Sequence, residues 1–286
     1  MSPERLKATM PSPVILQHVA GTDITDTMVE EAAELFSRFY GVWGPLADQH
    51  LGSFAKQGDR EQQCSLEEIP FLTLFLGRRV RMSAANLRRQ ILPDHGDNSY
   101  VRAMVGNELV GNVFATRYDI VSDGPSTSKV CWITQLCVDP RYRRQGLATK
   151  MIRMILQNRG RAEEDTWLGI LSSHPAAILA TLRACGGGPE TVDPGIVTAR
   201  RAQEGMRSCP VSYVRHAKLR GSCFEENSEE GVVSCADTGF WVDHGEPMGV
   251  LQAFKARGLR WAFGDLPEGH EFLALLDLSV TQACTA

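Results

Sequence analysis

The chain has 286 residues, of which 43% are hydrophobic and 22% are charged, and its formal net charge at pH 7 is -4. This composition is that of a globular protein, and the slight acidity provides no general attraction for nucleic acid. No run approaches the roughly 20 apolar residues that cross a bilayer, and residues 1–7 lack the apolar core of a secretory signal. A cytoplasmic protein without a membrane partner is expected.

The first predicted elements are a strand over residues 14–19 and a helix over residues 28–40. Thr25 or Asp26 is expected to cap this helix, and Gly41 to end it. Residues 44–70 show no clear period and predict a long loop. A second helix is predicted from residue 84 to about residue 92, with Ser83 at its start.

The middle of the chain predicts strands at residues 100–105, 109–118, 130–138 and 167–171. Gly106 and Asn107 indicate a hairpin between the first two strands. Helices are predicted at residues 146–157 and 175–184. In the last third, strands are predicted at residues 232–242 and 271–280, with a helix at residues 250–255. This order predicts an α+β fold on a mostly antiparallel sheet.

The cysteines favour reduced side chains. None of the eight is in Cys-x-x-Cys spacing, and Cys131 and Cys137 lie inside an apolar strand. Thiols packed as small hydrophobic groups are favoured over disulfides or a zinc site.

The strongest functional signal follows the strand that ends at Pro140. A loop with Arg141, Arg143 and Arg144 leads to Gly146, where an amphipathic helix carrying Lys150 begins. Unpaired N–H groups at a helix N-terminus favour an anion, and glycine lets a phosphate approach the main chain. The loop therefore predicts a pyrophosphate site.

The segment Arg143-x-x-Gly146-x-Ala148 resembles the Q/R-x-x-G-x-G/A signature of the GNAT acetyltransferases, in the same strand–loop–helix context. The resemblance covers residues 100–187 well. It implies a GNAT-like sheet splayed at its central strands and flanked by helices. It also implies one domain over residues 1–286, with an N-terminal part and acceptor-side loop (12–98), an acyl-CoA-binding core (99–190) and C-terminal strands on the acceptor side (191–286).

The same resemblance implies acetyl-CoA as co-substrate and no metal. The pantetheine arm would pair with the main chain of Leu136, Cys137 and Val138. The phosphates would be held by the loop and the first helical turn, which comprise Arg143, Arg144, Gln145, Gly146, Leu147, Ala148 and Thr149. Arg141, Arg143 or Lys150 would reach the ribose phosphate.

In this family an amine attacks the thioester directly, and the Val138 N–H is the expected oxyanion donor. Residues 134–136 contain no carboxylate, and Leu182 stands where many relatives have a tyrosine. His174 is the candidate base or acid, because an imidazole titrates near neutral pH. Two alternatives stay open: His174 packs beside a capped helix, or the thiolate needs no dedicated acid.

On the acceptor side, Tyr40 and Trp43 predict a pocket wall, with ordinary core packing as the alternative. Asp237 and His244, together with the acids and imidazoles of residues 266–272, can recognise a cationic acceptor or supply a base. No tight spacing supports a metal site.

The function predicted is acetyl transfer from acetyl-CoA to an amine of a small molecule. A cluster of arginines between Arg78 and Arg89 motivates an alternative, a GNAT-fold transferase that uses aminoacyl-tRNA. Apart from that case no nucleic-acid partner is expected. Because residues 134–136 lack a carboxylate and Leu182 replaces the tyrosine, a third hypothesis is a non-catalytic acyl-CoA-binding module.

Overall fold

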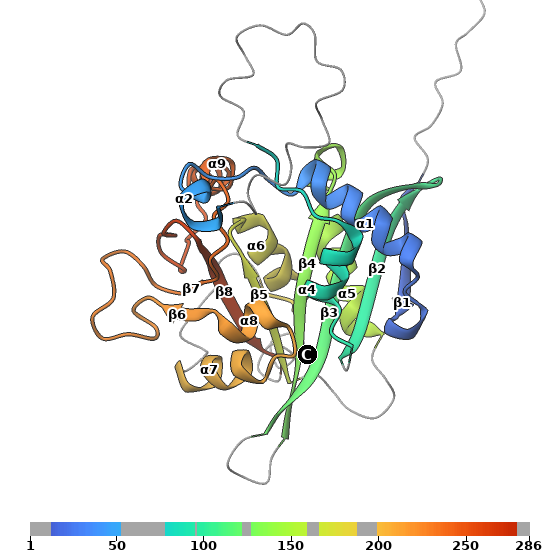
Figure 1. Ribbon diagram of the computed structural model, residues 1–286. Coiled ribbons are helices and arrows are strands. Elements are labelled where there is room, and N and C mark those ends of the chain that lie inside the picture. Colours follow the sequence, from blue (N-terminus) through green and yellow to red (C-terminus); the bar gives the residue numbers. More distant parts are fainter. Residues whose placement is uncertain are drawn as a thin grey trace, which may run out of the picture.

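The computed structural model describes residues 13–52, 78–94, 96–121, 127–158, 166–187 and 199–278. Their strands form one sheet in the order β1-β2-β3-β4-β5-β8-β7-β6 (Figure 1). Among the described strands, β4 and β5 pair in parallel and all other neighbours are antiparallel. The strands are β1 (Ile15–Ala20), β2 (Asp97–Val105), β3 (Glu108–Val121), β4 (Thr127–Val138), β5 (Trp167–Ser172), β6 (Lys218–Arg220), β7 (Cys235–Asp237) and β8 (His270–Asp277).

The expected α+β architecture on a mostly antiparallel sheet is thus confirmed, with helices on both faces of the sheet (Figure 1). The α-helices are α1 (Asp26–Phe39), α2 (Ala47–Leu51), α4 (Ala84–Ile91), α5 (Leu147–Gln157), α6 (Pro175–Ala184), α7 (Ala199–Ser208), α8 (Ser212–His216) and α9 (Gly245–Lys255). The short 3-10 helices η1 (Gly21–Asp23) and η3 (Pro140–Tyr142) complete the elements.

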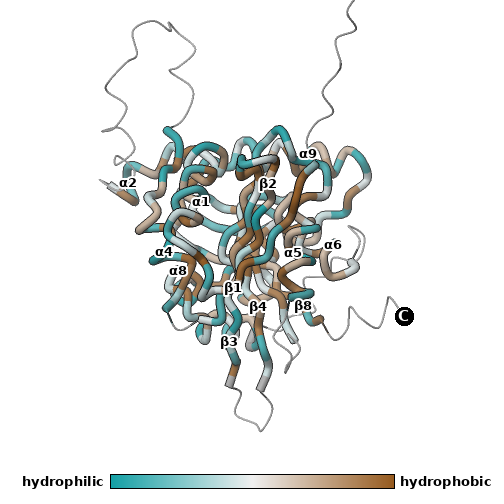
Figure 2. The backbone as a smooth tube through the Cα atoms, turned by 90° about the vertical axis from the view of Figure 1, so that its right-hand side faces the viewer, coloured by the Kyte–Doolittle hydropathy of each residue, from teal (hydrophilic) through white to brown (hydrophobic). Residues whose placement is uncertain are grey.

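Helices α5 and α6 cover one face of the sheet. Met151 and Ile155 of α5 and Ile178 of α6 pack there on Ile133 of β4 and Ile170 of β5, and all five side chains are buried. Hydrophobic stretches lie along the central strands and hydrophilic segments lie mainly outside them (Figure 2). Burial of this apolar surface is the main force that holds the helices on the sheet.

The opposite face is covered by two separate groups of helices. Helices α1 and α4 pack over β2, β3 and the end of β4, where Tyr100 and Phe114 are buried. Helices α7 and α8 pack over the other end of β4 and over β8, around Trp132 and Leu273. We call this side of the sheet the acceptor face, because the acceptor is expected to bind there.

Local signals explain why these elements begin where they do. The Thr25 and Ser83 side chains accept N–H groups at the start of α1 and α4, as expected of cap residues. Gly106 has a φ of 58° in the turn between β2 and β3, a conformation that glycine adopts without strain.

Two expectations about irregular regions were wrong. Residues 44–70 are not a continuous loop, because α2 lies within them; residues 53–77 are outside the described part of the chain. The predicted strand 232–242 contains only the short β7. The apolar residues after β7 pack on α1 instead, since Phe240 lies against Tyr40 and Trp43.

The six cysteines in the described ranges are reduced, and Cys64 and Cys284 lie outside those ranges. No helix that the structure describes combines the length and apolar character required to cross a membrane.

Candidate active site

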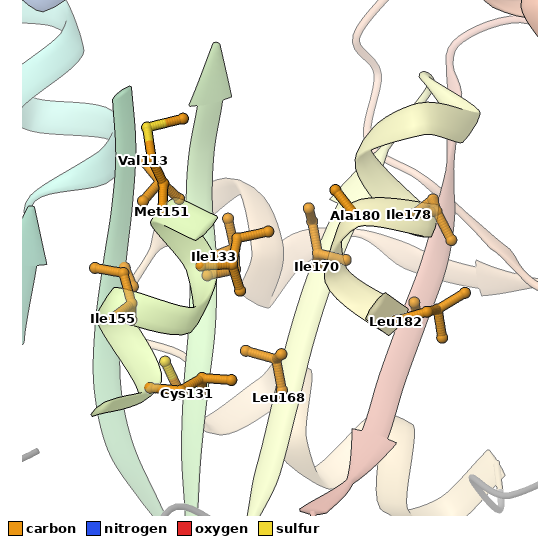
Figure 3. Close-up of a cluster of buried hydrophobic side chains, with 14 of the residues drawn as sticks. Val113, Cys131, Ile133, Met151, Ile155, Leu168, Ile170, Ile178, Ala180 and Leu182 are labelled. Carbon is orange, nitrogen blue, oxygen red and sulfur yellow. The ribbon is translucent and has the colours of Figure 1, made fainter. Parts of the chain in front are cut away.

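Strands β4 and β5 run side by side for four residues and then separate. Their pairing begins with Val130 opposite Trp167 and stops with Ile133 opposite Ile170, although β4 continues to Val138 and β5 to Ser172. Figure 3 shows the two strands diverging beyond Ile133 and Ile170, with α5 beside β4 and α6 beside β5. Among the described strands, only β3 pairs with the last part of β4.

A β-bulge lies where the two strands separate. Gln135 is opposite Phe114 and Ile133 is opposite Ala115, so Thr134 is the extra residue on β4. The displaced Thr134 carbonyl accepts a hydrogen bond from the Tyr213 hydroxyl of α8, at 3.0 Å. This hydrogen bond therefore holds α8 at the bulge, where β4 and β5 separate.

Beyond the bulge, main-chain polar groups of β4 face the space between β4 and β5 beyond Ile133 and Ile170, which we call the gap. The Asp139 N–H donates to Val110 on β3 (2.9 Å), whereas the Val138 carbonyl accepts from Arg143 Nε (3.0 Å). Main-chain groups of successive residues alternate sides along a strand. Leu136 and Val138 consequently direct their N–H and C=O groups away from β3, toward the side that β5 has left. Cys137 faces β3, and burial raises the pKa of its thiol to about 12.

The loop after β4 has an irregular main chain that is stabilised by internal hydrogen bonds. Asp139 accepts from the Arg141 N–H (2.8 Å), and Pro140 begins η3. Arg144 (φ 61°) and Gly146 (φ 74°) are both left-handed, which is uncommon and strained for a residue other than glycine. Such alternating conformations form an anion-binding nest, and the N-terminus of α5 adds its own unpaired N–H groups.

Two of the three cations expected at the ribose phosphate are engaged within the protein. Arg141 contacts Asp139 at 2.7 Å and Glu108 at 2.5 Å. Arg143 donates from Nη2 to the Phe39 carbonyl at the end of α1, at 2.9 Å, as well as to Val138. Lys150, on the first turn of α5, is exposed.

His174 is the N-cap residue of α6. Its Nδ1 accepts the Ala176 N–H at 3.1 Å, and its own N–H donates to Ser172 Oγ at 3.1 Å. Because Nδ1 is an acceptor here, the proton of the neutral ring lies on Nε2. Nε2 is 3.3 Å from Glu246 Oε2. In this tautomer His174 offers a proton donor and no proton acceptor.

Glu246 connects the two sides of the gap. From the first turn of α9, its carboxylate lies 3.4 Å from Arg143 Nη1 and 3.3 Å from His174 Nε2. The hydrogen bond from His174 is the main cause that lowers the pKa of this carboxyl, and Arg143 adds to it. An ionised Glu246 therefore links the loop after β4 to the start of α6.

Glu271, in β8, is buried on the acceptor face with 5% of its surface exposed. Burial raises its pKa to about 7, against hydrogen bonds with the Thr238 side chain and the Ser173 main chain. Tyr40 and Tyr213 interact with this carboxyl, and burial together with its negative charge holds both tyrosine pKa values well above their usual range.

The structure places Tyr40 and Trp43 in a cluster of aromatic side chains. The ring of Tyr40 stacks on Phe36 with centroids 4.2 Å apart, and Trp43 meets Phe240 edge-on at 5.5 Å. Trp43 is a core residue, 7% exposed. Tyr40 also packs in this cluster, but it additionally interacts with Glu271.

The C-terminal candidates lie beside this cluster. Asp237 ends β7 and accepts the Gly239 N–H at 3.2 Å. His244 precedes α9 and is buried, and this burial lowers its pKa. No group of three or more His, Cys, Asp or Glu side chains suited to a metal ion occurs among the described residues.

Sequence reasoning included Glu271 only within the group of acids and imidazoles of residues 266–272, and it did not point to Tyr213. The signal for Glu271 is a lone acid at the start of the apolar run that follows it, in which Phe272 packs with α5 and α6 and Leu273 with α7 and α8. Tyr213 gave no such signal, because its helix is only five residues long.

Residues 66–186 match the sequence model of the Acetyltransferase (GNAT) family. That range contains β2 to β5, the loop after β4, α5 and α6. The match, which covers less than half of the chain, indicates an N-acetyltransferase domain of the GNAT type in this region.

Solved structures resemble the chain only distantly. The aminoglycoside acetyltransferase meta-AAC0020 from an uncultured soil metagenomic sample, in complex with sisomicin, is 16% identical over 50% of this chain and 68% of its own, with a TM-score of 0.26. NAA60 of Arabidopsis thaliana in complex with acetyl-CoA is 15% identical over 37% and 71%, with a TM-score of 0.30. ElaA of Escherichia coli is 11% identical over 56% and 78%, with a TM-score of 0.30. No curated protein matches the sequence.

Proposed function

We propose that the protein transfers the acetyl group of acetyl-CoA to the amine of a small molecule, by direct attack of the amine on the thioester. The observation that carries the proposal is a gap in the sheet that ends at the loop after β4, where Arg144 and Gly146 are left-handed. Leu136 and Val138 turn their main-chain groups toward this gap. The amides of a pantetheine arm can pair with such a strand edge, and a pyrophosphate suits the N–H groups from Arg144 to Thr149.

The chemistry requires a donor for the developing oxyanion and a path for protons. The Val138 N–H is directed toward the gap and is the proposed oxyanion donor. The proposed role of His174 is that of a hydrogen-bond donor: its Nε2–H holds the Glu246 carboxylate at the end of the gap. Lys150 is proposed as the partner of the ribose phosphate, since Arg141 and Arg143 contact other residues.

The arginines that motivated a tRNA-dependent reaction have partners within the protein. Arg78 contacts Asp48, Arg88 lies 2.8 Å from Asp26, and Arg89 donates to Asn86 at 2.7 Å. The two ion pairs of Arg78 and Arg88 lessen the positive charge available to a polyanion. We therefore prefer a small-molecule acceptor.

The test measures free thiol released from acetyl-CoA in the presence of amino acids, polyamines and peptides. Release that depends on an amine and rises above simple hydrolysis is the expected result. Tight binding of acetyl-CoA without release for any amine would leave only an acyl-CoA-binding module. Absence of acetyl-CoA binding by calorimetry would remove the assignment of the site as well.

A further inference from the structure

Glu271 is an ionisable residue in an otherwise apolar row. On the acceptor face of β8 it is followed by Leu273 and Leu275, which are buried against α7 and α8. A carboxylate in such a position loses its hydration, and an apolar side chain there would avoid this cost. Its presence therefore calls for a reason other than packing.

The surroundings of Glu271 come from four parts of the chain. Thr238 follows β7, Ser173 follows β5, Tyr40 follows α1 and Tyr213 belongs to α8. The hydroxyl of Tyr213 also binds the carbonyl of Thr134, the bulged residue at which β4 and β5 separate. The carboxyl group is thus joined through one side chain to the strand that is proposed to bind the thioester.

Glu271 lacks a counter-ion in the part of the chain that the structure describes. No arginine, lysine or histidine in the described ranges forms an ion pair with it, and its partners are the Thr238 side chain and the Ser173 main chain. Buried carboxylates that serve structure alone are usually paired with a cation. An unpaired one close to the strand that is proposed to bind the thioester is suited to exchanging a proton.

We propose that Glu271 is the general base of the transfer and accepts the proton that the acceptor ammonium loses before its nitrogen attacks the thioester. The inference rests on the proposed function and assigns the role for which residues 134–136 of β4 have no carboxylate.

The transfer conserves protons and electron pairs. One proton passes from the ammonium to the Glu271 carboxylate, and the nitrogen lone pair forms the new C–N bond. The C–S bond then breaks with its electron pair on sulfur. The remaining surplus proton on nitrogen is transferred to that thiolate, and the proton on Glu271 returns to solvent.

The titration of Glu271 suits this role. With a pKa of about 7, the carboxyl populates both forms near neutral pH, which a general base requires. The two tyrosines that interact with it titrate elsewhere, because burial keeps the pKa values of Tyr40 and Tyr213 well above their usual range. The pKa of Glu246, across the gap, is lowered.

The same shift links Glu271 to stability. Its pKa rises from an ordinary 4.5 to about 7 on folding, so the folded protein binds the proton more tightly. The cost of the buried charge is therefore absent below about pH 4.5, grows with rising pH and is complete above about pH 7. Glutamine at this position removes that cost.

The test compares wild type with Glu271→Gln and Glu271→Asp over about pH 5.5 to 9. In Glu271→Gln we expect kcat to fall about 100-fold or more, with KM for acetyl-CoA unchanged within about twofold. The wild-type rate should rise through a group of pKa near 7, and the residual rate of Glu271→Gln should lack that rise. Glu271→Asp should keep the rise at a reduced rate. At about pH 8, Glu271→Gln should melt at a higher temperature than wild type.

The matched control is Glu230→Gln, which removes one negative charge from an exposed position and should leave kcat unchanged. A Glu271→Gln enzyme with wild-type kcat, or a wild-type profile that is flat across about pH 6 to 8, overturns the inference. If Glu271→Gln is less stable than wild type and its rate keeps the same pH dependence, Glu271 has only a structural role. If that variant does not fold, the wild-type and Glu271→Asp profiles decide.

The two proposals fail in different ways. If wild type releases no thiol with any amine, the proposed function fails and the assignment of Glu271 fails with it. If wild type is active and Glu271→Gln is equally active, only the assignment of Glu271 fails.

Discussion

The two sides of the proposed active site are built differently. The cofactor side is one continuous stretch, in which β4, η3 and α5 follow one another and present main-chain groups. The acceptor side collects side chains from distant segments, namely Tyr40 after α1, Tyr213 in α8, Glu246 in α9 and Glu271 in β8. A ligand bound by main-chain groups needs only a local loop conformation, whereas proton transfer needs ionisable groups brought together by the whole fold.

This comparison predicts a division of mutational effects. Changes on the cofactor side should weaken acetyl-CoA binding, and changes on the acceptor side should alter kcat and its pH dependence. Arg143 and Glu246 join the sides, because Arg143 contacts Phe39, Val138 and Glu246.

The largest effect is expected for Gly146→Asp. A Cβ at Gly146 would meet no atom within 4 Å, so the folded loop has room for a side chain, but a carboxylate there would repel the phosphates. We expect affinity for acetyl-CoA, measured by calorimetry, to fall about 100-fold or more, roughly 3 kcal/mol.

Gly146→Asn is the matched control, because asparagine and aspartate both tolerate the left-handed φ of 74°. It should bind several-fold better than the aspartate variant. Equal affinity of Gly146→Asp and wild type would show that the cofactor phosphates lie elsewhere.

The next effect concerns the paired part of β4 and β5, on which both sides depend. Gly169 of β5 is opposite Trp132 of β4, and a methyl group at Gly169 would overlap the tryptophan ring. Because Trp132 is fully buried, we expect Gly169→Ala to lower the free energy of unfolding by about 2 kcal/mol. Denaturant unfolding measures the change.

Gly205→Ala is the control for this substitution, since a Cβ on that α7 residue would meet neighbours at an ordinary 3.5 Å. It should leave stability unchanged or slightly raised. Stability of Gly169→Ala equal to that of wild type would contradict the tight packing of Trp132 on β5.

The smallest effect separates the two contacts of His174. His174→Asn keeps a side-chain acceptor for the Ala176 N–H and removes the Nε2–H that binds Glu246, whereas His174→Ala removes both. We expect kcat to fall about tenfold in both variants, the worth of one hydrogen bond to a charged group. Only His174→Ala should also lose about 1 kcal/mol of stability.

Steady-state kinetics and thermal melting measure these changes. If His174→Asn has the same kcat as wild type, the only role of His174 is to cap α6. A large rise of KM for acetyl-CoA in the same variant would show that His174 contributes to cofactor binding. It would contradict the division between cofactor-side and acceptor-side effects.

The cofactor side was largely predictable because its signals are local. Pro140 ends β4, Gly146 precedes α5, and Pro175 begins α6, so each boundary follows from the conformational limits of one residue. The acceptor side was predicted less well. Phe240 and Val242 suggested a strand, but they are apolar because they pack with the cluster of Tyr40 and Trp43.

Sequence patterns alone were sufficient to predict the order of strands and helices over residues 100–187 and the loop proposed to bind the cofactor phosphates. The folded structure was needed to show that β4 separates from β5 after Ile133, and that Tyr40, Tyr213 and Glu271 interact on the acceptor face. The physical reason is that main-chain geometry depends on neighbouring residues, whereas the burial that raises the pKa of Glu271 depends on side chains from distant parts of the chain.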